Sequence, residues 1–411
     1  MNTAAARRYQ LPFGWVLVVA GLLQLTLFAY ATAPGLAGTS DSRYYLHAAE
    51  TLRTAGQLLH PDDTPYRYWP PLYPVLLSAC GSLSGIRVLH GACLLGSLLL
   101  WSWLGRQVLP GWRALAAPLL LALSTPALLV GKFVWAESAF LLLFAAYAAV
   151  LWQWLRTGRG TWWVVLALLG LLLPLQRTLG LFLLLGAGVG LLGQWRQLRP
   201  AQWWLLATQQ AMSAAGGLLW QWHALLAGPS RYHPSRGWSA LLSSVADFGF
   251  VLGRWLVPLP SGARALVPGA LWAGLLVVLF ALLWPRRARP ATPLLAVSVP
   301  AQVLLRPLWG AALSLVALVA ALTVFAQSAA GVHDAERYAS VLFGPVVVLV
   351  LAAWPGRWPR WIGAGLLAGW LLGLAARSTH VAADLRQLPP LSLTSGARPE
   401  DDGQRVGAAG Q

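Results

Sequence analysis

The chain has 411 residues, of which 58% are hydrophobic and 10% are charged, and its 29 Lys and Arg residues against 12 Asp and Glu leave a formal net charge of +17. Charged residues make up about a quarter of an ordinary soluble domain, so this composition excludes one. The basic residues are spread between apolar runs rather than gathered in one stripe, which argues against a nucleic-acid-binding protein. The composition predicts an integral membrane protein.

Apolar runs follow one another along most of the chain, and many reach the length of about 17–25 residues that crosses a bilayer. They predict an all-α polytopic membrane protein with about eleven transmembrane helices. The predicted spans are 12–33, 86–105, 114–130, 136–154, 161–175, 178–194, 201–227, 264–284, 310–328, 338–354 and 361–376. The first run ends in Ala-Thr-Ala, which resembles a signal-peptidase site, but it exceeds the about 7–15 residues of a signal-peptide core, so we predict an uncleaved anchor.

The charges divide the segments between these spans into two alternating sets. One set carries arginines and no acid, whereas all twelve Asp and Glu residues fall in the other set. Cytoplasmic loops of membrane proteins are rich in Lys and Arg. This partition therefore predicts a cytoplasmic N-terminus and an extracytoplasmic C-terminus for a multi-pass protein of the plasma (inner) membrane.

Two stretches fit this topology less simply than the others. Residues 239–258 are apolar but carry an acid and Arg254, and we predict an interfacial helix on the outer side. Residues 293–305 are too short to span the membrane comfortably. We predict one transmembrane domain over residues 1–380, followed by a mobile extracytoplasmic tail over 381–411, which is rich in Pro, Gly and acids.

The first outer loop, residues 34–85, holds the longest polar stretch before the tail. Asp41 opens an amphipathic pattern that ends at Gly56, which predicts a helix along the outer membrane surface. Asp41 is equally well interpreted as the N-cap of this helix or as a functional carboxylate, and the two roles are compatible. Asp62 and Asp63 stand between His-Pro and Thr-Pro, which is typical of a turn.

Several polar motifs mark the outer ends of the predicted spans. They are, in chain order, Asp41 soon after the first span, Pro70-Pro71-Leu72-Tyr73-Pro74, Lys132-Phe133-Val134-Trp135-Ala136-Glu137-Ser138, Gln176-Arg177-Thr178-Leu179-Gly180-Leu181, and Glu336-Arg337-Tyr338. In order, spacing and topology this set resembles the GT-C membrane glycosyltransferases, particularly the branch of protein O-mannosyltransferases and bacterial lipid A aminoarabinose transferases. The resemblance covers residues 12–200 well and the remainder loosely.

The resemblance implies a membrane glycosyltransferase whose donor is a polyprenyl-phosphate sugar and whose active site faces away from the cytosol. The acceptor would be an extracytoplasmic glycan, lipid or protein. Such a transfer needs a base for the acceptor hydroxyl, and Asp41 is the best-placed carboxylate for that role. It also needs cations for the phosphate, and the planar guanidinium groups of Arg177 and Arg337 suit phosphate oxygens, with Lys132 as an additional point charge.

Glu137, Tyr73 and Tyr338 complete the set of substrate-binding candidates, and most of these residues also have a purely structural interpretation. Arg177 fits a snorkelling anchor at the membrane edge. Glu137 opens a predicted helix, where the helix dipole favours a carboxylate without any functional role. Arg337, Tyr338 and Tyr73 fit simple residues of the membrane interface. The sequence alone leaves both interpretations open.

In the resembled family the loop aspartate is commonly followed by a glutamate, whereas this chain has Ser42. A divalent metal held by an adjacent acid pair is therefore not supported, and the seven histidines include no pair at metal-ligand spacing, so we predict no zinc and no certain cofactor. Two other functions compete with the enzyme: a transporter or flippase of lipid-linked sugars, and a non-catalytic assembly factor. Transporters place polar sites near the bilayer midplane and often have inverted repeats, whereas this chain keeps its acids at one surface.

Overall fold

The structure is a computed structural model that describes the chain from residue 10 to residue 391 with several gaps. The gaps are residues 68, 194–199, 227–238, 258, 261, 286–301, 326–331 and 355–358. Most of the stretch 293–305 and the end of the predicted tail, 392–411, therefore lie outside the described residues. Within the described part the structure is helical, and its only extended pairings are two isolated bridges, Ala37 with Phe133 and Leu59 with Pro65.

The described helices confirm the all-α prediction. They are α2 (Gln10–Ala31), α3 (Ser40–Ala55), α4 (Leu72–Cys80), α5 (Leu83–Val108), α6 (Trp112–Ala122), α7 (Thr125–Lys132), α8 (Glu137–Thr157), α9 (Gly160–Gln176), α10 (Leu179–Leu192), α11 (Pro200–Leu226), α12 (Ser239–Leu256), α13 (Ala263–Leu266), α14 (Gly269–Leu282), α15 (Gln302–Phe325), α16 (Val332–Ala339), the 3₁₀ turn η2 (Ser340–Leu342), α17 (Phe343–Ala353) and α18 (Arg360–Gln387).

Seven helical segments among the described residues are long and apolar enough to cross a membrane, so the chain is a multi-pass membrane protein. These segments coincide with seven of the predicted spans. Three further predicted spans fall on the shorter apolar helices α9, α10 and α14, and the span 201–227 falls on α11. The total of eleven crossings and the orientation of the termini stay predictions.

Besides the C-terminal helix, two predicted elements differ from the structure. The span 114–130 is broken into α6 and α7 at Ser124, because the Ser124 hydroxyl accepts the Ala127 N–H at 3.2 Å and Pro126 lies in the first turn of a new helix. The interfacial helix predicted at 239–258 corresponds to α12. This helix contributes Phe248 and other apolar residues to the main core. It is therefore buried more deeply than a helix lying on a membrane surface.

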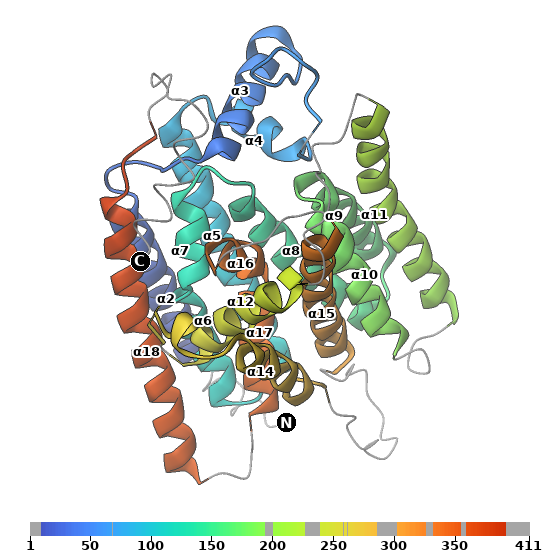
Figure 1. Cartoon of the computed structure of the whole chain (residues 1–411). Coiled ribbons are helices and arrows are strands. Elements are labelled where there is room, and N and C mark those ends of the chain that lie inside the picture. The colour runs from blue at the N-terminus through green and yellow to red at the C-terminus, as the bar shows by residue number, and fades with distance from the viewer. Residues whose placement is uncertain are drawn as a thin grey trace.

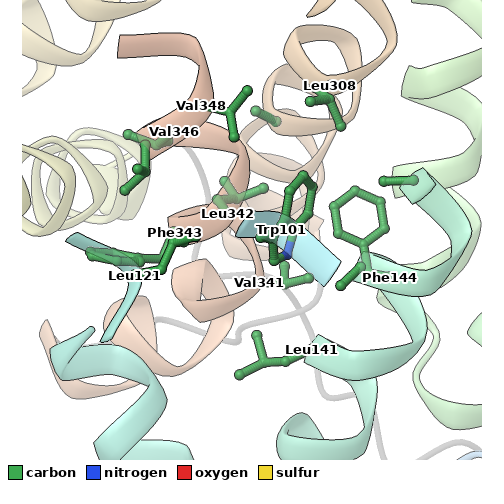
Figure 2. Close-up of a cluster of buried hydrophobic side chains, with 14 of the residues drawn as sticks. Trp101, Leu121, Leu141, Phe144, Leu308, Val341, Leu342, Phe343, Val346 and Val348 are labelled. Atoms are coloured by element: carbon green, nitrogen blue, oxygen red, sulfur yellow. The ribbon is translucent and has the colours of Figure 1, made fainter. Parts of the chain in front are cut away.

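Close packing at aromatic and glycine residues holds the long helices together. Figure 2 shows Trp101 of α5 beside Phe144 of α8 and Val341 of η2, and the Trp101 and Phe144 ring centroids are 6.0 Å apart. A Cβ atom at Gly344 of α17 would lie 2.6 Å from the Trp101 ring, so only glycine fits there. At the α10–α15 crossing, a Cβ atom at Gly186 or Gly310 would collide with the backbone of the opposite helix.

The first outer loop forms a cap beyond the ends of the long helices, where Figure 1 shows α3 and α4. The predicted amphipathic helix is α3, which ends at Gly56 in the left-handed region (φ 69°), so the helix and its end are confirmed, while its place along the outer membrane surface stays a prediction. The turn predicted at Asp62 and Asp63 is also confirmed, because Asp63 has a φ of 59° and the Asp62 carboxylate accepts the Thr64 hydroxyl at 2.7 Å. That bond lowers the pKa of the exposed Asp62 carboxyl.

The C-terminal helix α18 is longer than predicted, since it continues to Gln387 instead of ending near 376. Ala382 and Leu385 are buried, which explains why the helix persists past the apolar run. After the helix, the Leu391 N–H donates to the Leu36 carbonyl at 2.7 Å and attaches the chain to the start of the outer loop. The predicted boundary of a mobile tail at 381 is therefore too early.

Candidate active site

Asp41 lies in the first turn of α3 and is free of any capping role. The N-cap is Thr39, whose N–H donates to the Ser42 hydroxyl at 3.0 Å in a capping box. The interpretation of Asp41 as the N-cap is thus wrong, and the fully buried Ser42 has a structural role of its own. The Asp41 carboxylate instead pairs with the Arg337 guanidinium at 2.9 Å, and its side chain is 23% exposed.

Glu137 is the first residue of α8 and lies at the centre of the cluster. Its Oε1 atom forms ion pairs with both Arg177 and Arg337, which come from distant parts of the chain. The second oxygen, Oε2, is buried and accepts no hydrogen bond among the described residues. The α8 dipole favours a carboxylate here, but two buried guanidinium groups are the larger influence.

Arg177 follows directly after α9, and the end of that helix turns its side chain inward. Its guanidinium lies 5.5 Å from the centroid of the Tyr338 ring and pairs with Glu137. The side chain is only 13% exposed. The interpretation of Arg177 as a snorkelling anchor is therefore wrong, because a snorkelling side chain reaches out to water.

Arg337 comes from the short helix α16 and connects the two acids. It bonds to Glu137 through Nε and to Asp41 through a terminal nitrogen. Its guanidinium also lies 4.1 Å from the centroid of the Trp135 ring, a cation–π distance. The Trp135 indole N–H in turn donates to the Thr39 hydroxyl at 2.9 Å, so Trp135 joins the cluster to the start of α3.

The four charges of this cluster balance, with two carboxylates and two guanidinium groups. Paired in this way, each charge avoids the large cost of burial without a partner. Tyr45 of α3 is buried beside them, and burial, with the Asp41 charge, raises the pKa of its phenol above the usual range. Tyr45 therefore stays neutral and forms part of the wall of the site. We call Asp41, Glu137, Arg177 and Arg337 the outer cluster.

Lys132 and Tyr73 have other partners. The Lys132 ammonium donates to the carbonyl oxygens of Ala31 at 3.1 Å and Gly35 at 2.9 Å, and so closes the end of α2. The Tyr73 hydroxyl pairs with His90 at 2.8 Å, while its ring packs edge-on against Tyr45 with centroids 5.0 Å apart. Both residues therefore support the surroundings of the outer cluster rather than join it.

The arrangement does not suit a metal ion. Each acid of the outer cluster pairs with Arg337, and the residue after Asp41 is the capping Ser42. Within the described ranges, no group of three His, Cys, Asp or Glu residues lies close enough to hold one.

A second buried set of charges was not predicted. The Glu336 carboxylate pairs with Arg254 of α12 and, at 3.0 Å, with Arg377 of α18. Thr125 of α7 also donates its hydroxyl to Glu336, at 3.4 Å. We call Glu336, Arg254 and Arg377 the inner cluster. The sequence contains a sign of this cluster, since Arg254 and Arg377 each stand in or next to an apolar stretch. A charge buried at membrane depth needs a partner.

No protein-family model and no curated protein matches this sequence. Among solved structures, the chain is similar to ArnT from Cupriavidus metallidurans bound to undecaprenyl phosphate, with 14% sequence identity, a TM-score of 0.57, and coverage of 90% of this chain and 70% of that one. The apo structure of the same ArnT matches with 16% identity, a TM-score of 0.45, and coverage of 90% and 78%. The first of these matches shows that the chain shares the overall fold of ArnT.

Proposed function

We propose that this protein is a membrane glycosyltransferase that moves a sugar from a polyprenyl-phosphate donor to an extracytoplasmic acceptor. The observation that carries the proposal is the outer cluster, in which the partly exposed Asp41 pairs with Arg337 and the buried Glu137 joins Arg337 to Arg177. The fold also supports the proposal, because the chain is similar to ArnT, whose structure contains undecaprenyl phosphate. Arginine pairs readily with phosphate, and a carboxylate serves as a general base.

In the proposed reaction the acceptor oxygen attacks the anomeric carbon of the sugar while Asp41 takes the hydroxyl proton. The bond from the anomeric carbon to the phosphate oxygen breaks, and its electron pair leaves on the phosphate. The products are the glycosylated acceptor and the polyprenyl phosphate, and a single displacement inverts the anomeric centre. Arg177 and Arg337 stabilise the charge that accumulates on the leaving phosphate.

Arg337 connects donor binding to the base. In the structure its guanidinium bonds to Asp41, so an incoming phosphate competes with the Asp41 carboxylate for the same N–H groups. Binding of the donor thereby releases Asp41 to accept the acceptor proton. Glu137 is buried and keeps both arginines in place during this exchange.

The test is transfer of labelled sugar from a polyprenyl-phosphate donor in membranes that contain the wild-type protein or Asp41→Asn. We expect the variant to lose about 10²–10⁴-fold in rate, the usual contribution of a general base. The matched control is Glu50→Gln, which removes an exposed acid from the same helix. Wild-type rates for Asp41→Asn would refute its assignment as the base, and lipid translocation in vesicles without a glycosidic product would point to a carrier instead.

The substrates can be found independently by mass spectrometry of cell-envelope glycans and lipids from cells with and without the protein. The mass lost in its absence identifies the sugar. The fraction that loses this mass identifies the acceptor. An unchanged envelope in cells that express the protein under the growth conditions tested would count against a transferase with an envelope acceptor.

A further inference from the structure

Two neighbouring residues of α16 serve the two buried clusters. Arg337 contacts the outer cluster, whereas Glu336, one position earlier, contacts the inner cluster. Successive side chains on a helix point about 100° apart, because a turn contains about 3.6 residues. The rotation of α16 about its own axis therefore determines both sets of contacts together.

Contacts from three helices hold Glu336 in place. Arg254 of α12 and Arg377 of α18 pair with its carboxylate, and Thr125 of α7 donates to it at 3.4 Å. The two arginines are also bonded to each other, because Arg377 donates to the Arg254 carbonyl at 2.9 Å. All three members of the inner cluster are buried, with side-chain exposures between 5% and 11%.

The apolar contacts of α16 come from two partly buried side chains, Val332 and Tyr338, and two buried alanines, and the helix continues directly into η2 and α17. The helix is eight residues long, and its buried apolar side chains, Ala335 and Ala339, are small. Small side chains pack over little area and resist rotation weakly. The charged contacts of Glu336 and Arg337 therefore add directional restraints to this packing, and those of Glu336 come from helices that do not contribute to the outer cluster.

We propose that Glu336 is a positioning residue: held by Arg254 and Arg377, it sets the rotation of α16 and thereby places the Arg337 guanidinium between Asp41 and Glu137. Its consequence for sugar transfer rests on the proposed function, whereas its effect on α16 does not. In this arrangement α12 and α18 support the candidate active site without touching it.

A single substitution at Glu336 is not a clean test. The inner cluster contains two guanidinium groups and one carboxylate, so Glu336→Gln leaves two buried cations that repel each other. The double variant Glu336→Gln/Arg377→Gln removes one charge of each sign and preserves the net charge of the cluster. It abolishes the ion pairs of Glu336 and leaves one buried cation, Arg254, in place of two that repel each other.

The matched control is Asp247→Asn/Arg264→Gln. These two residues form a partly buried ion pair at 2.6 Å between α12 and α13, and neither belongs to the outer or the inner cluster. This control removes the same kinds of charge from the same half of the molecule. It reports how far the loss of any ion pair near α12 affects the protein.

The experiment uses the full chain in lipid nanodiscs and measures hydrogen exchange of the 332–353 segment together with kcat and KM for sugar transfer. For the Glu336/Arg377 double variant we expect amide exchange in α16 at least about tenfold faster than in the control, as for a locally loosened element. We expect kcat to fall about 10–100-fold with KM within about threefold, because a small misplacement of a catalytic group is costly.

Exchange and kcat equal to those of the control variant would overturn the proposal. Faster exchange in α16 without any loss of kcat would also overturn it, since Arg337 would then be placed correctly without Glu336. If the wild-type protein transfers no sugar from polyprenyl-phosphate donors, the proposed function fails. The hydrogen-exchange comparison still decides in that case whether Glu336 holds α16.

Discussion

The outer and inner clusters share helix α16 but differ in access and in charge balance. The outer cluster has two acids and two arginines, and the Asp41 side chain is 23% exposed at the outer loop. The inner cluster has one acid and two arginines, and none of its side chains is more than 11% exposed. Only the outer cluster therefore offers a carboxylate that a substrate can reach without the helices separating.

This difference separates a site suited to chemistry from one suited to support. An accessible carboxylate whose partner is an arginine can exchange that partner for a phosphate. A carboxylate enclosed by two arginines and three helices has no such exchange available, and its removal leaves buried charges without a partner. Substitutions in the outer cluster should therefore affect activity more than stability, and those in the inner cluster should affect both.

Among the comparisons of the two clusters, the largest expected effect is that of Arg337→Lys on transfer. Lysine keeps the positive charge, but its single ammonium nitrogen lacks the planar fork through which two nitrogens of the guanidinium bond to Asp41 and Glu137. We expect kcat to fall about 10²–10³-fold, as for loss of one oriented donor at a developing charge. The measurement is steady-state transfer kinetics with Arg53→Lys as control, since Arg53 is exposed on α3. Equal rates for the two variants would show that bridging the acids is unimportant.

The next largest expected effect is a difference in stability between a variant of the inner cluster and a variant of the outer cluster. Glu336→Gln leaves Arg254 and Arg377 facing each other without a carboxylate, and breaking such a buried pair costs about 3–5 kcal/mol. Asp41→Asn should cost less than about 1 kcal/mol, because its carboxylate is partly exposed and screened by solvent. Thermal unfolding of both variants in the same lipid checks this order. A larger loss for Asp41→Asn would reverse the distinction between the clusters.

A smaller effect on stability is expected at a helix crossing that contains no charged side chains. Gly186→Ala places a Cβ atom against Gly310 at the α10–α15 crossing and should destabilise the protein by about 1–3 kcal/mol. Gly369→Ala on α18 meets no atom within 4 Å and is the control, which should be neutral or slightly stabilising. Unfolding temperatures provide the comparison. If both variants behave alike, close approach of α10 and α15 contributes little to stability.

The smallest expected effect concerns the start of α3. Ser42→Ala removes the hydroxyl that accepts the Thr39 N–H and should cost about 1 kcal/mol, the usual value of one hydrogen bond. Hydrogen exchange of the first turn of α3 measures the loosening, and Ser78→Ala on α4 is a control that loses a hydroxyl donating to a carbonyl of its own helix. Unchanged exchange at α3 would show that the capping box does not hold Asp41 in place.

Much of this architecture could be predicted from local pattern. The apolar runs predict the helices because lipid requires a span of about 20 apolar residues with its backbone bonded internally. The amphipathic period after Asp41 and the glycine at position 56 predict α3. The motif order predicts the fold, and the four residues that form the outer cluster were all among the candidates.

The features that were not predicted from the sequence are contacts between distant segments of the chain. The bonds of Lys132 to the end of α2 were not predicted, and its part in phosphate binding stays a prediction. Arg377 was not singled out, because an arginine in an apolar stretch reveals that it needs a partner but not which one. How deeply α12 is buried and how far α18 extends depend on which helices cover them. The periodicity of the sequence within one segment does not contain that information.

The sequence by itself determined that this is a helical membrane protein, where its helices lie, and which charged residues deserve attention. Only the tertiary structure decided that Glu137 meets Arg337 across 200 positions, and that Glu336 meets Arg254 and Arg377 in a separate cluster. The physical reason is that periodicity and composition act within one helix. A buried charge, in contrast, is stabilised by whichever opposite charge the packing of several helices brings within reach.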